Sequence, residues 1–318
     1  MNLKTVLVAS AAMLAAAAAP IELRAQSAPA ATKASAAQKT FASPGEASRA
    51  LADAVRASDR KAILAILGPR SKSWLFTGDD VADREDGRKF LAAYDRKNAI
   101  AKASDAKAVF NVGDDDWAFP APLVRQGGVW RFDSEAGREE VVRRRVGRNE
   151  LDTIQTLLAI VDAQREYAAA DADRNGFNDY ARKFISSEGK KDGLYWPVKS
   201  GETPSPLGPL VGAATREGYG AKAGAAPAPY HGYRYRMLTA QGKDAPGGAY
   251  GYLVKDKLIG GFAIVAYPAK YGVSGVMTFL VNHDGVVYQK DLGAATDSQA
   301  VKMQLFNPGK TWKKTRPD

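Results

Sequence analysis

The 318-residue chain contains no cysteine and only two histidines, His231 and His283. The lack of cysteine excludes disulfides, a cysteine nucleophile, thiolate-bound metals and the lipid-modified cysteine that anchors a lipoprotein. Zinc prefers Cys and His ligands, so two histidines do not favour a zinc site. The chain also lacks a Gly-x-x-x-x-Gly-Lys-Ser/Thr loop and a Gly-x-Gly-x-x-Gly turn between a strand and a helix, which argues against a nucleotide site.

Long apolar runs are absent after residue 20. At the N-terminus, Lys4 precedes an Ala-rich apolar run over residues 5–19, and Ala25 is a small residue at a plausible cleavage point. This layout is typical of a secretory signal peptide, and the run is short for a bilayer span, which needs ~20 strongly apolar residues. We therefore predict a signal peptide over residues 1–25, a periplasmic or secreted protein, and no transmembrane segment once the signal is removed.

Positive charge is in excess but is not concentrated. The chain has 45 Lys and Arg against 35 Asp and Glu, a net charge of +10, and both halves carry part of the excess. Because a nucleic-acid binder gathers its charge in a patch or stripe, we do not predict a nucleic-acid partner. The one dense basic run, residues 143–145, follows Glu139 and Glu140, an order that suits the dipole of a helix. We interpret this run as the solvated end of a helix.

The first folded region follows residues 26–42, which are rich in Ala, Ser and Pro and are predicted to be a disordered linker. Ser43, Pro44 and Glu46 form the start of a helix with a capping box. Helical patterns continue to residue 97, and strand patterns over residues 106–133 include a hairpin turn at "QGGVW". We predict an α+β domain over residues 43–148, with helices packed on a small antiparallel sheet, that resembles NTF2-like or cystatin-like domains.

The second predicted domain covers residues 149–318. Asn149 is expected to cap a long amphipathic helix, in which Leu151, Ile154 and Leu158 recur at helical spacing. A loop region rich in Gly and Pro follows, then antiparallel strands with a tight hairpin at residues 282–285. This order resembles, more distantly, the globular part of type IV pilin-like proteins. Because a separate domain and an ordinary export signal precede the helix, filament assembly is not predicted.

Several long motifs carry a more specific resemblance. The motifs are "VGDDDWAFPAPLV", "RRRVGRNEL", "DGLYWPVKSGETPSPLGPL", "HGYRYRMLTAQGKDAPGGAYGY", "GGFAIVAYPAKYGVSGVMTFLVNHDGVVYQKDLG" and "FNPGKTW". They are similar to the DUF2950 family of exported bacterial proteins, from about Phe41 to Trp312. The family is uncharacterised, so the resemblance implies export but no catalytic or binding residue.

The stretch "DADRNGFNDY" has the spacing of a calcium loop. Asp171, Asp173, Asn175 and Asp179 match the first, third, fifth and ninth positions, with a glycine at the sixth. The closing position, however, is Arg182, where such a loop needs a bidentate carboxylate. A polar turn after the helix is the alternative, and we predict little calcium binding at micromolar concentration and no other cofactor.

Aromatic residues in loops are the candidate binding residues. Tyr195 and Trp196 lie in a Gly- and Pro-rich segment, where rings can contact a glycan, a peptide or a partner protein. Tyr233 and Tyr235 alternate with arginines and are expected to face the core. Core packing or loop anchoring is the alternative role for all of these rings.

No coherent catalytic set is visible in the sequence. Ser274 lies in "GVSGV", which is not a Gly-x-Ser-x-Gly elbow, and only His231 or His283 could serve it as a base. The three carboxylates of residues 114–116 suggest a glycan-cleaving site, but consecutive loop residues rarely converge, which favours a solvated turn. We therefore expect a non-catalytic binding or scaffolding module that acts on an envelope protein or glycan. A hydrolase acting on an envelope polymer is the alternative.

Overall fold

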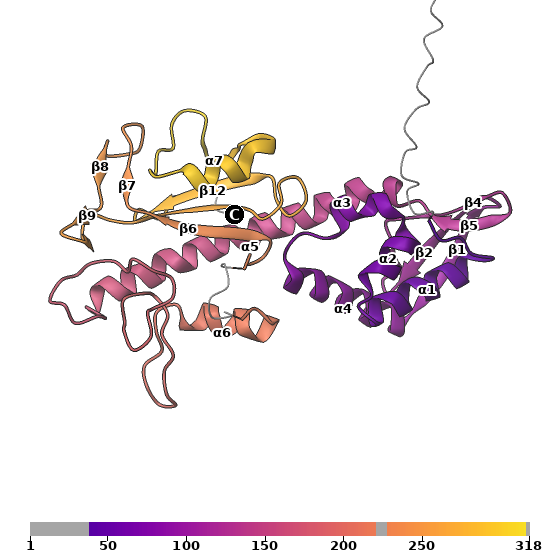
Figure 1. Ribbon diagram of the computed structural model, residues 1–318, viewed down its shortest axis with the longest axis horizontal. Coiled ribbons are helices and arrows are strands. Elements are labelled where there is room, and N and C mark those ends of the chain that lie inside the picture. Colours follow the sequence, from indigo (N-terminus) through magenta and orange to yellow (C-terminus); the bar gives the residue numbers. More distant parts are fainter. Residues whose placement is uncertain (1–37, 221–227, 316–318) are drawn as a thin grey trace, which may run out of the picture. The chain divides into compact units, whose positions relative to one another are not determined.

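The computed structural model describes residues 38–220 and 228–315, drawn as coloured ribbon in Figure 1. The predicted signal peptide and all but the last residues of the predicted linker lie outside these residues. Helices and antiparallel sheets alternate along the chain, so the predicted α+β class is confirmed. Within the described residues, no helix combines the length and the hydrophobicity that a bilayer crossing requires.

The N-terminal helices begin after polar residues that cap them, and the predicted start at Ser43 is confirmed. α1 (Pro44–Arg56) follows Ser43, whose hydroxyl accepts the Glu46 N–H. α2 (Arg60–Leu67) follows Asp59, and its C-cap is Gly68. α4 (Asp80–Arg96) follows Asp79, whose carboxylate accepts two N–H groups of the first turn. Between α2 and α4 lie a 3-10 turn, η1 (Pro69–Ser71), and the short helix α3 (Lys72–Leu75).

These helices pack on a five-stranded antiparallel sheet. Its strands are β1 (Asn98–Ser104), β2 (Lys107–Val112), β3 (Trp117–Ala118), β4 (Leu123–Gln126) and β5 (Val129–Phe132). The predicted hairpin is confirmed, since Gln126 pairs with Val129 across Gly127 and Gly128. Both glycines have positive φ, which suits the turn. Phe110, Leu123 and Phe132 lie with Leu51 in one hydrophobic cluster under the helices.

One 36-residue helix, α5 (Ser134–Ala169), continues where two helices were predicted. The prediction that Asn149 caps a new helix is wrong, because Asn149 lies inside α5 and its side-chain amide donates to the Ser274 carbonyl, 2.9 Å away. Gly147 does not break the helix. The boundary predicted between residues 148 and 149 therefore falls inside a continuous helix, and residues 36–318 form one compact unit. Whether the two predicted domains fold separately stays a prediction.

A second five-stranded antiparallel sheet forms the C-terminal part, in the order β14-β13-β12-β11-β6. The strands are β6 (Tyr233–Leu238), β11 (Ala263–Pro268), β12 (Met277–Asn282), β13 (Tyr288–Asp291) and β14 (Lys313–Lys314). Every residue of β11 is buried, because α5 covers one face of this sheet and α7 (Thr296–Lys302) the other (Figure 1). The β12–β13 hairpin exists, but Leu280 pairs with Tyr288, so its loop is wider than predicted.

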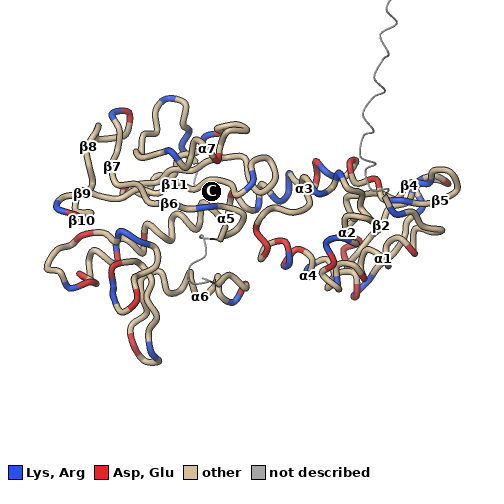
Figure 2. The backbone as a smooth tube through the Cα atoms, viewed as in Figure 1, with Lys and Arg blue, Asp and Glu red and all other residues tan. Residues whose placement is uncertain are grey.

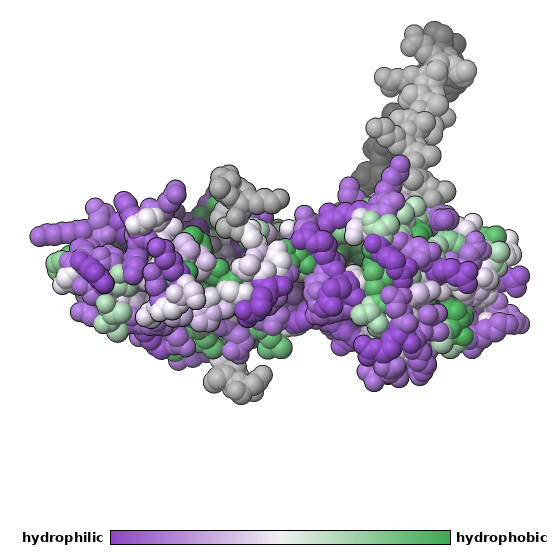
Figure 3. All heavy atoms as spheres, turned by 90° about the horizontal axis from the view of Figure 1, so that it is seen from below, coloured by the Kyte–Doolittle hydropathy of each residue, from purple (hydrophilic) through white to green (hydrophobic). Residues whose placement is uncertain are grey.

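Smaller elements complete the chain. β7 (Ala240–Gln241) pairs with β8 (Tyr250–Gly251), β9 (Leu253–Val254) pairs with β10 (Lys257–Leu258), and η2 (Gly293–Ala295) precedes α7. α6 (Gly208–Glu217) lies in the region predicted to be only loop. The NTF2-like, cystatin-like and pilin-like likenesses remain predictions. On the face drawn in Figure 3, hydrophobic residues form small separate patches among hydrophilic ones. Lys and Arg are distributed along the backbone among Asp and Glu (Figure 2).

Candidate functional site

Tyr195 and Trp196 lie on an extended segment held against residues 183–187. The Tyr195 N–H donates to the Phe184 carbonyl at 2.9 Å, and the Tyr195 carbonyl accepts the Ser186 N–H at 2.8 Å. The turn between the two segments is closed by Asp192, whose carboxylate accepts the Ser187 N–H and pairs with the Lys183 ammonium at 2.8 Å. Ile185 and Tyr195 form a parallel bridge, so the two candidate aromatic residues are positioned by a braced loop.

The Trp196 ring is fixed by two neighbours. Tyr167 of α5 contacts it edge to face, with 6.5 Å between the ring centroids. The Lys191 ammonium lies 5.0 Å from the Trp196 ring centroid, a cation–π distance. Trp196 itself is half-buried. Lys191 thus covers part of the indole, and the rest of the ring surface is available to the neighbouring groove.

Tyr195 and Trp196 line one side of an open groove with a volume of about 710 Å³. Pro197, Val198 and Pro204 extend the apolar wall, and α6 supplies the facing residues Val211, Gly212, Thr215 and Arg216. Residues 211 and 215, and 212 and 216, are four apart and so share one face of the helix. This size and this mainly apolar lining with a few polar groups are typical of a ligand site.

Two polar side chains of the groove lack partners within the described residues. The hydroxyl of Ser205 is buried and makes no hydrogen bond. Arg216 is exposed and has no carboxylate partner, although most arginines of the helices are paired, as Arg56 and Arg88 are. An unpaired guanidinium beside an apolar wall favours a ligand that carries an acidic group.

The predicted calcium residues form a compact polar turn after α5. The Asp171 carboxylate accepts the N–H groups of Asn175 and Gly176, at 2.9 and 3.0 Å. The side-chain amide of Asn175 donates to both Asp173 and Asp179, at 2.6 and 2.8 Å. The amide therefore donates hydrogen bonds to oxygens of the two carboxylates that would face a cation. Within the described residues, no three or more His, Cys, Asp or Glu side chains are arranged to hold a metal ion.

Arg182, the residue at the closing position of the calcium pattern, points away from this turn. Its guanidinium donates to the Asp256 carbonyl at 3.0 Å and lies 3.7 Å from the Asp256 carboxylate. It adds no direct repulsion at the turn, but it also leaves the twelfth ligand position without an oxygen. Calcium binding by Asp171, Asp173, Asn175 and Asp179 stays a prediction.

His231 lies between two carboxylates contributed by helices. Its Nδ1 is 3.7 Å from Asp152 of α5, and its Nε2 is 3.6 Å from Glu217 at the end of α6. The imidazole also contacts the Tyr230 ring, with 4.1 Å between centroids. His231 has φ of 49°, an unusual conformation for a residue other than glycine. It lines neither the groove of Trp196 nor the cavity described below.

Ser274 and His231 do not form a catalytic pair. The Ser274 hydroxyl is buried and exchanges hydrogen bonds with the backbone of Lys270, donating to its carbonyl and accepting its N–H. Both ring nitrogens of His231 face carboxylates instead. The hydroxyl therefore stabilises the turn after β11 through its bonds to the backbone, and no general base among the described residues contacts it to activate it as a nucleophile.

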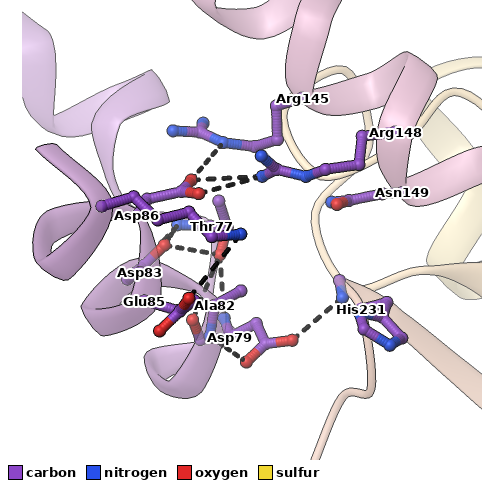
Figure 4. Close-up of polar contacts among 12 residues, drawn as sticks. Thr77, Asp79, Ala82, Asp83, Glu85, Asp86, Arg145, Arg148, Asn149 and His231 are labelled. Atoms are coloured by element: carbon purple, nitrogen blue, oxygen red, sulfur yellow. Dashed lines mark hydrogen bonds and ion pairs between the residues drawn. The ribbon is translucent and has the colours of Figure 1, made fainter. Parts of the chain in front are cut away.

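A buried carboxylate, Asp79, joins α4 to the His231 segment (Figure 4). Asp79 is 2% exposed. Besides capping α4, it accepts the Gly232 N–H at 2.9 Å and the Tyr219 hydroxyl at 3.0 Å. Burial raises the pKa of Tyr219 far above its usual range, and the Asp79 charge raises it further, so the hydroxyl remains a donor.

A second set of polar contacts joins the same helix to α5. Asp86 pairs with Arg148 at 3.1 Å and lies 4.0 Å from Arg145 (Figure 4). Asp83 accepts the hydroxyl and the N–H of Thr77, and burial raises its pKa despite these bonds. Arg145 is 8% exposed and donates to the carbonyl of Trp74. The interpretation of residues 143–145 as a solvated helix end therefore fails for Arg145, which is buried in the middle of α5.

The three consecutive aspartates of residues 114–116 do not converge. Asp114 pairs with Arg96 at 3.1 Å and Asp116 pairs with Lys97 at 2.8 Å, and all four side chains are exposed. These ion pairs join the β2–β3 turn to the end of α4. The predicted solvated turn agrees with this geometry.

The groove would have been hard to find from sequence, because α6 was not predicted. Pro209 in the first turn and the glycines at 208 and 212 read as loop, yet proline is tolerated at the start of a helix. Arg216 was therefore missed. The available signal was that Arg216 lies four residues after Gly212, a spacing that puts both on one face if the segment is helical.

One comparison with known proteins identifies the family, and none of the comparisons adds an activity. A model of the DUF2950 family, described as a protein of unknown function, matches residues 38–315. No curated protein and no solved structure matches the chain. The match covers nearly all of the described residues, and the chain therefore belongs to the DUF2950 family.

Proposed function

We propose that the chain is an exported envelope protein that acts as a non-catalytic binding module through the groove of Trp196. The observation that carries the proposal is that Tyr195 and Trp196, on a braced loop, line the same groove as the unpaired Arg216 on α6. A rigid aromatic wall beside a free cation is an arrangement suited to recognition. Export rests on the N-terminal pattern of Lys4 and the apolar run that follows it.

The chemistry of the groove favours an extended peptide segment over a glycan. A glycan carries hydroxyls on every unit and needs many polar partners, whereas the side-chain polar groups here are few, mainly Ser205, Thr215 and Arg216. Lys191 already covers part of the Trp196 ring. Grooves lined by aromatic residues accept extended, proline-containing peptides with little ordering cost. We propose an apolar, extended segment of an envelope protein that bears an acidic residue opposite Arg216.

Selection from a displayed random peptide library tests this proposal. The expected result is enrichment of sequences that combine proline or other apolar residues with Asp or Glu, and loss of their binding to the Trp196→Ala variant. Trp117→Ala is the matched control, because Trp117 is also partly exposed, at 39%, but lies on β3 outside the groove. Peptides that bind both variants equally, or no enrichment, would contradict the proposal. If the protein binds a glycan array and the Trp196→Ala variant does not, the groove is the binding site but its ligand is a glycan rather than a peptide.

A hydrolase acting on an envelope polymer is the second candidate, and His231 is the observation that favours it. A histidine flanked by Asp152 and Glu217 has the components of general acid–base catalysis. The test is incubation of the protein with purified peptidoglycan, followed by mass spectrometry of soluble fragments. Release of fragments that stops in His231→Gln would support hydrolysis. Release of none, or release unchanged by the variant, would exclude a role for this cluster.

A further inference from the structure

A positively charged cavity lies between the segment after α2 and the loop after β11. Its volume is about 630 Å³, and it is lined by Pro69, Arg70, Lys72, Ser73, Glu135 and Lys270. Three cations thus face one carboxylate. They come from two segments nearly two hundred residues apart, so the fold, rather than a local basic run, brings the charges together.

Two of the three cations are free. Arg70 and Lys72 are exposed, and neither has a hydrogen-bond or ion-pair partner among residues 38–220 and 228–315. Nearby Arg60 differs, since it pairs with Asp80 at 2.6 Å. Glu135 lines the cavity as a counter-charge, and the carboxylate of Asp83 also attracts the Lys270 ammonium. The charges of Arg70 and Lys72 have no ion-pair partner within the described residues.

The third cation, Lys270, is held in place. Its ammonium donates to the Phe76 carbonyl at 3.1 Å, and the carbonyls of Trp74 and Leu75 accept from Arg145. The three consecutive carbonyls at the end of α3 are thus bound by buried or half-buried cations, and the bond to Phe76 fixes the position of the Lys270 ammonium. Burial lowers the pKa of Lys270 because it removes water from the ammonium, and an anion in the cavity would offset that loss.

We propose that this cavity binds an oligoanionic ligand, whose phosphate or carboxylate groups pair with Arg70, Lys72 and Lys270. Arginine presents a planar fork that matches either group, and lysine adds a point charge. The cavity is open to solvent, and its volume of about 630 Å³ exceeds the need of a single oxyanion. Glu135 repels negative charge at its edge of the cavity, which orients the ligand toward the three cations. The site is separate from the groove of Trp196 and does not depend on the function proposed for it.

Titration calorimetry with tripolyphosphate and, separately, citrate tests the site. We expect at least one of the two anions to bind the unmodified protein, and the double variant Arg70→Gln/Lys72→Gln to lose about tenfold or more in affinity, because each bond between charged groups is strong. The control is Lys102→Gln/Arg125→Gln, which removes one exposed lysine and one exposed arginine from the N-terminal sheet. Its affinity should be unchanged, although its net charge falls equally.

A third variant tests the sign of the effect. Glu135→Gln removes the one carboxylate of the cavity and is expected to raise the affinity severalfold. Binding of tripolyphosphate alone identifies a phosphate ligand, and binding of citrate alone identifies a carboxylate ligand. The proposal is overturned if neither anion binds, if the control variant loses as much affinity as the cavity variant, or if Glu135→Gln weakens binding. Thermal melts of each variant verify that it folds.

Discussion

The carboxylate of Asp79 lies 3.0 Å from the hydroxyl of Tyr219, although 140 residues separate them in the chain. The same carboxylate caps α4 and accepts the Gly232 N–H. One buried side chain therefore connects the N-terminal helices to the end of α6 and the start of β6.

Replacing Asp79 with alanine should destabilise the protein more than the loss of a helix cap does. The cap contributes about 1 kcal/mol, and each of the two further bonds to the carboxylate adds about 1.5 kcal/mol. Asp59→Ala is the control, because Asp59 caps α2 through the Ala62 N–H alone and is exposed. Urea unfolding should give a loss of about 4 kcal/mol for Asp79→Ala and about 1 kcal/mol for Asp59→Ala. Equal losses would show that the bonds to Tyr219 and Gly232 are unimportant.

Arg145 and Arg143 are neighbours in the same basic run but should respond differently to substitution by methionine. Arg145→Met leaves the buried carbonyls of Trp74 and Leu75 without their donor and should cost about 2 to 4 kcal/mol of stability. Arg143 is exposed and pairs with Glu140 on the surface, so Arg143→Met should change stability by less than about 0.5 kcal/mol. Chemical denaturation of the two variants measures their free energies of unfolding and tests this difference. A small effect at Arg145 would mean that water replaces its guanidinium.

Two glycines of α5 give a test of helix packing. A Cβ on Gly137 would lie 2.4 Å from the Pro120 carbonyl oxygen, whereas a Cβ on Gly147 would meet nothing within 4 Å. Gly147→Ala should stabilise the protein by about 1 kcal/mol, the usual difference in helix propensity. Gly137→Ala should instead destabilise it, since backbone must move. A melting temperature that rises in both variants would show that α5 does not approach Pro120 this closely.

The contacts of Asp192 predict that the loop before Tyr195 is sensitive to acid. The Lys183 ammonium, with the hydrogen bonds from Ser187, lowers the pKa of Asp192 from 3.8 to about 2. A carboxylate with a lowered pKa contributes stability that is complete above its ordinary pKa and is lost as the pH falls through the folded value. The difference in melting temperature between the unmodified protein and Asp192→Asn should therefore be constant above pH 3.8 and shrink toward pH 2. A difference that grows on acidification would contradict the brace.

Calcium at micromolar concentration should leave the melting temperature unchanged. The Asn175 amide already lies between the carboxylates of Asp173 and Asp179. The closing position offers no carboxylate oxygen because it is occupied by Arg182, whose guanidinium bonds to Asp256. Binding would require the amide to turn and several waters to complete the shell. A rise of several degrees that chelator reverses, and that disappears in Asp173→Asn, would instead establish Asp171, Asp173, Asn175 and Asp179 as ligands.

The sequence by itself determined the features that depend on neighbouring residues. The start of α1 follows Ser43, and the glycine pair after Gln126 forms a hairpin. A cap or a turn is decided by bonds within a few residues, so its pattern is readable in one short stretch. The α+β class follows from the order of such stretches.

Three features were decided only by the tertiary structure. They are the continuation of α5 past Asn149, the burial of Arg145, and the set of side chains that face Trp196 across the groove. Asn149 has the residue type of a cap, but its amide bonds to Ser274 and the helix runs on. Arg216 and Arg70 look like other arginines in the sequence, and which cavity or groove a side chain lines depends on segments far away in the chain. Burial and convergence depend on how distant elements pack, and local preference is too weak to predict a contact made across more than a hundred residues.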